Sequence, residues 1–170
     1  MGDRKPPIVS IAKPSKSTTT VPARSSNLRL KKTFSDLDAD IFLNKAFDYI
    51  AAYFEGSLAE LSERNQGVDG RFQRIDAHTF EATIYRAGKK QAACSIHIGT
   101  SGLRGSSITY SNDTTARGNS FNESLSVTFD DQELYLRSLG MANWSGSAPE
   151  NLSLEGGAEL LWSMLIRDLQ

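Results

Sequence analysis

The sequence predicts an α+β fold in two layers: an N-terminal helix pair, an antiparallel β-meander of five to six strands, and a C-terminal helix. Three observations predict it. Apolar residues recur at helical spacing over residues 34–61 and 154–169, and they alternate with polar residues over 71–139. The connections within the alternating region are only a few residues long, whereas a parallel crossover needs about a dozen. The strands are therefore expected to be antiparallel neighbours.

Length and composition limit the class of protein. The chain has 170 residues, of which 39% are hydrophobic and 23% charged, which fits one soluble domain with a polar attachment. No run approaches the ~18 consecutive apolar residues of a membrane helix. One cysteine (Cys94) excludes an internal disulfide, and two histidines (His78 and His97) are too few for a His/Cys metal cage, so no metal or cofactor is predicted. The N-terminus lacks the apolar core of a secretory signal, which predicts a cytoplasmic protein.

Residues 1–32 differ from the rest of the chain in charge. They carry eight basic residues and one acidic residue (+7), whereas residues 33–170 carry 11 basic and 19 acidic residues (−8). Four of the five prolines also lie in the first segment. Such a segment buries too little apolar surface to offset the entropy of ordering. We therefore expect a disordered, basic, Pro/Ser/Thr-rich tail or linker, followed by a single α+β domain over residues 33–170.

The first helical region begins at Ser35, which forms a capping pair with Asp38. A second capping box, Ser57 with Glu60, follows Gly56. The region is therefore expected to form two helices, or one helix kinked at that glycine. Its wide apolar stripe has to cover another element.

The strands follow as segments that alternate with period two. They are expected at residues 80–85, 94–98, 108–110, 125–129 and 134–137, after a short first strand around 72–75. The C-terminal helix begins after the cap Ser153, and Trp162 in its apolar stripe is expected to be a core anchor between helix and sheet. We expect both helical units on the face that carries Phe80, Ile84, Ile96, Val127 and Leu136.

The opposite face of the predicted sheet is polar. It carries serine and threonine residues together with Tyr85, His97, Tyr135 and Arg137. An ordinary solvated face needs the same alternation. The pattern therefore fits a solvated surface, or a recognition platform on which these four side chains stack and form hydrogen bonds. Nothing in the spacing distinguishes the two.

Two loops supply further candidate binding residues. Residues 99–105 contain three glycines and Arg104, which could together bind an anion, but no phosphate-binding fingerprint is present and a flexible hairpin loop is the alternative. The loop 111–123 contains Arg117, Asn119 and Asn122, and loops of this length are often functional or disordered. In a simple meander the two loops emerge at opposite ends of the sheet, so they would not form one site.

Catalytic signatures are lacking in the sequence. No nucleophile elbow of the G-x-S-x-G type occurs. Cys94 alternates with apolar residues, as an inert core thiol does, and the adjacent Asp130 and Asp131 fit a tight turn. We therefore predict no catalytic residues, with an enzyme of unrecognised site as an alternative.

Three sequence blocks resemble a known module. They are residues 54–61 closed by Arg64 and Asn65, residues 119–127, and residues 157–164. Together they resemble an accessory module on the C-terminal side of some bacterial TIR-domain proteins, over about residues 33–170 with the basic segment as the former linker. The resemblance implies a bacterial accessory domain that senses or binds. It does not imply NAD cleavage, because the catalytic TIR part is not in this sequence.

These observations lead to two main functional hypotheses. The first is a non-catalytic bacterial module that binds a protein partner or a small ligand, within a defence or signalling system. The second is a binder of an anionic, nucleotide-like molecule that uses Arg104, Arg117 and Arg137. Nucleic acid would be contacted only through the basic tail, and an exposed edge strand would permit a homo-oligomer.

Overall fold

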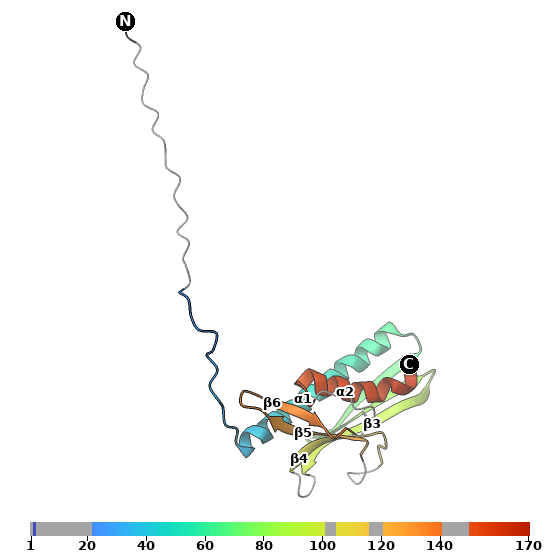
Figure 1. Ribbon diagram of the computed structural model, residues 1–170. Helices are drawn as coiled ribbons and strands as arrows, with labels where there is room; N and C mark the ends of the chain where they lie inside the picture. Colours follow the sequence, from blue (N-terminus) through green and yellow to red (C-terminus); the bar gives the residue numbers. More distant parts are fainter. Residues whose placement is uncertain (1, 3–21, 101–104, 116–120, 141–149) are drawn as a thin grey trace.

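The computed structural model describes residues 2, 22–100, 105–115, 121–140 and 150–170. Six strands form one antiparallel sheet in chain order, from β1 to β6. Figure 1 shows both helices on the same side of this sheet. The α+β class and the six-stranded meander are thus confirmed. The elements are α1 (Asp36–Arg64), β1 (Val68–Asp76), β2 (Thr79–Arg86), β3 (Lys89–Thr100), β4 (Ser106–Ser111), β5 (Glu123–Phe129), β6 (Leu134–Ser138), α2 (Leu154–Ile166) and the 3₁₀ turn η2 (Arg167–Leu169).

The N-terminal helical region is one helix, so the predicted helix pair is wrong. The capping box is present, because the N–H of Asp38 donates to Oγ of Ser35 and the N–H of Ser35 donates to Oδ2 of Asp38. From there α1 runs through Gly56 without a break. A glycine inside a helix costs about 1 kcal/mol relative to alanine. Phe54 and Leu58, one on each side of it, are fully buried, and burial of each contributes about 2 kcal/mol, which outweighs that cost.

The core lies between the helices and the sheet. Phe80, Ile84, Ile96 and Leu136 are fully buried there, as predicted. Val127 is partly buried and packs at the margin of the same core. The strands supply alternate residues to this layer, so the predicted inward face of the sheet is confirmed.

Aromatic rings connect the helices to the sheet. The Phe80 ring lies 5.6 Å and 5.5 Å from the rings of Phe47 and Phe54 on α1, and 5.2 Å from Phe72 on β1, between ring centroids. Trp162 of α2 meets Phe54 edge to face at 5.4 Å. Trp162 is a core residue, as predicted, and lies in the same buried cluster as residues of the sheet.

The two edges of the sheet differ. On the outer edge of β6, Leu136 exchanges two backbone hydrogen bonds with Leu152, each 2.8 Å long. The outer edge of β1 pairs with no other strand in the described part of the chain. The end of the predicted tail also contacts the domain, since the N–H of Lys32 donates to the carbonyl of Asp131 at 2.9 Å. Most of the predicted disorder in residues 1–32 falls outside the described residues.

Candidate functional site

The sheet face that points away from the helices carries the predicted polar side chains. The strand register places Thr79 opposite His97, and His97 opposite Thr109. His97 and Arg137 are separated by three strand spacings, or ~14 Å, across the sheet and by two residues, or ~7 Å, along the strands. The face between them bears small hydroxyl side chains. Residues that face one another across neighbouring strands form a row on this face. The row next to that of His97 contains Gly99, Ser107, Ser126 and Arg137.

His97 is held in one orientation on this open face. Its Nδ1 lies 2.9 Å from Oγ1 of Thr79. Its ring lies over Gly99, where an added Cβ would be 2.6 Å from Nε2. Because Thr79 engages Nδ1, Nε2 is the ring nitrogen that an external group can approach. The row of hydroxyl residues lies directly beside it.

The other predicted residues do not join His97 in one site. Tyr85 pairs with Lys90 near the far end of β2, six positions or ~20 Å from Thr79. Tyr135 lies on β6 opposite Thr128. Arg104, Arg117 and Asn119 fall outside the described residues. The connections on either side of β4 leave it at opposite ends, as predicted for the two loops.

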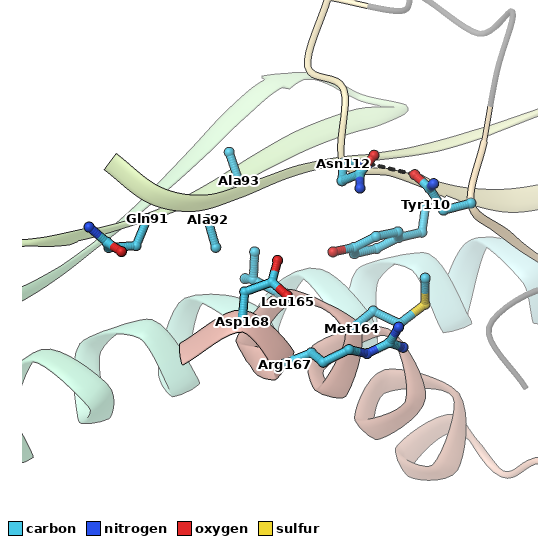
Figure 2. Close-up of a pocket in the computed structure, with 10 residues that line it drawn as sticks. Gln91, Ala92, Ala93, Tyr110, Asn112, Met164, Leu165, Arg167 and Asp168 are labelled. Atoms are coloured by element: carbon cyan, nitrogen blue, oxygen red, sulfur yellow. Dashed lines mark hydrogen bonds between the residues drawn. The ribbon is translucent and has the colours of Figure 1, made fainter. Parts of the chain in front are cut away.

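A pocket of about 460 Å³ lies between the sheet and the C-terminal end of α2 (Figure 2). This volume falls within the range of small-molecule sites, roughly 300–1,000 Å³. Of the predicted site residues in the described chain, only Asn122 lines it. The lining consists of Gln91, Ala92, Ala93, Tyr110, Asn112, Asn122, Met164, Leu165, Arg167 and Asp168.

The pocket forms because β4 ends before β3 does. The β3–β4 register stops at Ser95 opposite Ser111, so residues 91–93 of β3 have no strand partner on that side among the described residues. Gln91 is also the extra residue of a β-bulge, since Ala92 and Lys90 pair with consecutive residues of β2. Bulges are over-represented beside functional sites. The turn η2 packs against β3 next to the opening.

Tyr110 reaches into this pocket from β4 (Figure 2). Its side chain is 2% exposed. Burial, followed by the neighbouring Cys94 thiol to which it is hydrogen-bonded, raises the pKa of the Tyr110 phenol far above its usual value. Among the smaller influences on that pKa, Arg167 lowers it and Asp168 raises it. The hydroxyl therefore stays protonated.

Two asparagines border the pocket on the side of β4. The N–H of Asn112 donates to Oδ1 of Asn122 at 2.8 Å, and the N–H of Asn122 donates to the carbonyl of Tyr110 at 2.8 Å. These bonds join the two ends of the β4–β5 connection. Asn122, which the sequence offered as a binding residue, therefore also has a structural role.

Sequence reasoning missed Tyr110, Arg167 and Asp168. Tyr110 occupies an inward position of an alternating strand, where an aromatic residue is normally core. Arg167 and Asp168 follow the last turn of an amphipathic helix, where charged residues are ordinary. The unequal lengths of the predicted β3 and β4 segments are the one feature of the sequence that could have indicated the pocket.

The remaining candidates have structural roles. Cys94 is fully buried, and burial raises its pKa to about 12, which confirms its expected place in the core. Asp130 is a turn residue, as predicted, because its Oδ1 accepts from the N–H groups of Gln132 and Glu133. Within the described ranges, no group of three or more His, Cys, Asp or Glu residues could hold a metal ion. No helix in those ranges is long and apolar enough to cross a membrane.

Comparison with known proteins places the chain in a family. A family described as the Y4lF protein domain matches residues 69–167, more than half of the chain. The chain belongs to the Y4lF domain family. The Y4lF region includes nearly the whole sheet and α2, and therefore the open face and every residue that lines the pocket except Asp168.

One relative of this Y4lF domain is an uncharacterised protein named y4lF from Sinorhizobium fredii (strain NBRC 101917 / NGR234), which is 48% identical over 147 residues. The match covers 86% of this chain and 45% of the relative, so the chain spans less than half of that protein's length. No solved structure matches the chain. The resemblance to TIR-associated modules stays a prediction that neither match tests.

Proposed function

We propose that this Y4lF domain is a non-catalytic binding module whose ligand is a small polar molecule in the pocket between β3, β4 and the end of α2. The observation that carries the proposal is the position of Tyr110. Its phenol is buried, yet it lines a pocket of about 460 Å³ that also contains a guanidinium and a carboxylate. Pockets in which a few polar groups converge are the default small-molecule sites of proteins.

The chemistry of the lining supports binding rather than turnover. Acid–base catalysis works best with a group that titrates near the operating pH, and nucleophilic catalysis needs an activated nucleophile. The phenol of Tyr110 is held in its protonated form, and the nearby Cys94 thiol has a pKa of about 12. The other polar side chains that line the pocket are three amides, one guanidinium and one carboxylate.

A cavity-filling variant tests this function. The full chain is screened for thermal stabilisation by nucleotides, sugars, amino acids, carboxylates and amines, and native mass spectrometry checks each compound that stabilises it. A ligand at 100 times its Kd should add about 2.7 kcal/mol of stability. Ala92→Leu, which narrows the pocket, should abolish the effect, whereas Ala59→Leu on the exposed surface of α1 should retain it. A chain that no compound stabilises, or an undiminished response in Ala92→Leu, contradicts the proposal.

A second candidate function is binding of an anionic, nucleotide-like ligand on the open face. It is favoured by the fixed orientation of His97 and by Arg137 in the next row, with hydroxyl residues between them. The two rows that hold His97 and Arg137 contain no acidic residue between β2 and β6. A nucleotide panel should raise the melting temperature, and Arg137→Ala should remove that rise while Ala92→Leu does not. An unchanged melting temperature across the panel would end this candidate.

A further inference from the structure

We infer that the ligand of the pocket is a zwitterion, a small molecule with one anionic group for Arg167 and one ammonium group for Asp168, in the class of amino acids and short peptides. This inference rests on the proposed function of the same pocket and narrows it to one ligand chemistry. It is carried by the two charged side chains, their shared neighbour Tyr110 and the neutral remainder of the lining.

Arg167 and Asp168 are the charged residues among those that line the pocket. They are consecutive in η2, directly after α2. The ion pairs found in the described ranges lie on α1 and β1, and neither residue takes part in them. Both side chains are exposed. The pocket thus offers one positive and one negative charge, each open to an external counter-charge.

Both charges line the same pocket as the Tyr110 phenol. The pKa of Tyr110 is lowered by Arg167 and raised by Asp168, so each charge acts on its hydroxyl. In the view of Figure 2 the carboxylate of Asp168 lies on one side of that hydroxyl, and the guanidinium of Arg167 lies below and on the other side. A molecule that fills the pocket therefore meets both charges as well as the Tyr110 hydroxyl.

The paired charges select against a ligand with only one sign. A ligand with only an anionic group is attracted by Arg167 and repelled by Asp168. A simple amine is attracted by Asp168 and repelled by Arg167. A zwitterion gains from both contacts. Exposed ion pairs contribute about 0.2–1 kcal/mol each, so each match should improve the affinity by a factor of roughly 1.4–5. A nucleotide with several phosphates gains nothing from Asp168, which separates this pocket from the second candidate function.

The neutral lining fits the rest of such a molecule. Gln91, Asn112 and the Tyr110 hydroxyl offer donors and acceptors, while Ala92 and Met164 offer apolar contact. The volume of about 460 Å³ is generous for the smallest amino acids. We therefore expect an amino acid with a long side chain, or a dipeptide, to bind best.

Matched ligands and matched variants test the inference. The full chain is titrated by NMR with the twenty standard L-amino acids and with glycyl-leucine. The best ligand is then compared with the acid that lacks its amino group and the amine that lacks its carboxylate. Each analogue should bind more weakly by a factor of roughly 1.4–5. The shifted amide signals should be those of residues 91–93, 110, 112 and 122.

The variants separate the two charges. Asp168→Asn should weaken the zwitterion and strengthen the simple acid, whereas Arg167→Gln should weaken both the zwitterion and the simple acid and strengthen the amine. These opposite signs cannot arise from a general loss of structure. Arg64→Gln on α1, outside the pocket, should change none of the affinities.

Each result supports or overturns the inference. Equal affinity of the simple acid and the amino acid overturns it, as does an unchanged zwitterion affinity in Asp168→Asn. A third outcome separates the inference from the proposed function. If no amino acid or dipeptide binds, but another class of compound binds and Ala92→Leu blocks that binding, the inferred ligand class is wrong and the proposed function stands. If no compound of any class stabilises the chain, both are wrong.

Discussion

The imidazole of His97 occupies the space in which a methyl group on Gly99 would lie. An added Cβ would stand 2.6 Å from Nε2 and 3.2 Å from Cδ2. Residues two apart in a strand share one face, and side chains in strands lean along the strand direction. The His97 ring can therefore extend over the next position on its own face, provided that position has no side chain.

Replacement of Gly99 by alanine should displace the ring and break the bond between Nδ1 and Thr79. The imidazole signals of His97 in NMR spectra should shift, and the unfolding free energy should fall by about 1 kcal/mol or less, because one exposed hydrogen bond is lost. Thr79→Val should shift the same signals without any steric change. If Gly99→Ala leaves them unchanged, the ring does not lie over Gly99.

Two helical glycines should respond to alanine with opposite signs. A Cβ at Gly56 would meet nothing within 4 Å, so Gly56→Ala should stabilise the protein by up to about 1 kcal/mol through helix propensity. A Cβ at Gly157 would lie 2.6 Å from Cδ1 of the fully buried Leu136. Gly157→Ala should therefore destabilise by about 1–3 kcal/mol through overpacking. Urea unfolding of the two variants measures both effects, and equal signs would contradict the packing described for α2.

Truncation of Phe80, the central ring of the core, should lower the unfolding free energy more than truncation of any other single core residue. Phe80 is fully buried and touches three other rings, so Phe80→Ala should lower the unfolding free energy by about 3–5 kcal/mol. Phe129 is 61% exposed and touches the ring of Phe34. Phe129→Ala is the matched control and should cost less than about 1.5 kcal/mol. Similar losses in the two variants would mean that Phe80 is not central.

Stability should fall at alkaline pH because of Cys94. Burial raises its pKa from 9.0 to about 12, so the unfolded thiol ionises before the folded one. This contribution to stability is complete below pH ~9 and is lost as the pH rises towards the folded pKa. Cys94→Ala should make the unfolding free energy fall less steeply between pH 9 and 11, whatever its value at pH 7.

A second variant separates this effect from that of a tyrosine. The hydrogen bond to Glu159 is the main cause that raises the pKa of Tyr53 to about 12. The contribution of Tyr53 to the unfolding free energy is therefore lost only above pH ~10, the ordinary pKa of tyrosine in the unfolded chain. Tyr53→Phe should flatten the pH dependence above pH 10 and leave the interval from 9 to 10 unchanged. An identical pH profile in wild type and Cys94→Ala would mean that the thiol is not buried.

The sequence predicts the inward face of the sheet because burial follows the period of the strand. Phe80 and Ile84 occupy inward positions of the strand, and these positions are both apolar in the sequence and buried in the fold. The sequence-based prediction fails at Gly56, where the pair Ser57 and Glu60 has the spacing of a capping box but lies inside a continuous helix. That pattern is local, whereas the packing of Phe54 and Leu58 that continues the helix is tertiary. The first strand is also longer than predicted, since β1 is held by its hydrogen bonds to β2 and most of its residues are exposed.

The sites are less predictable than the fold. Alternation assigns His97 to the open face, but only the register shows that Thr79 and Gly99 orient it. The pocket joins β3 to the end of α2, more than sixty residues later in the chain. It depends on where β4 stops, and no periodic pattern encodes that. Tyr110 has the sequence context of a core residue and is also a lining residue of the pocket.

The Leu136–Leu152 bridge limits how copies of this sheet could add to one another. Growth into a fibre needs two free edges on every copy, so that each molecule receives one neighbour and offers a place to the next. The bridge occupies the centre of the outer edge of β6. β1 pairs with no second strand in the described chain, and its Gly70 N–H donates to Oγ of Ser62 on α1. Strand pairing between copies would therefore end at two molecules joined through β1, and the fold contains its own protection against open-ended polymerisation.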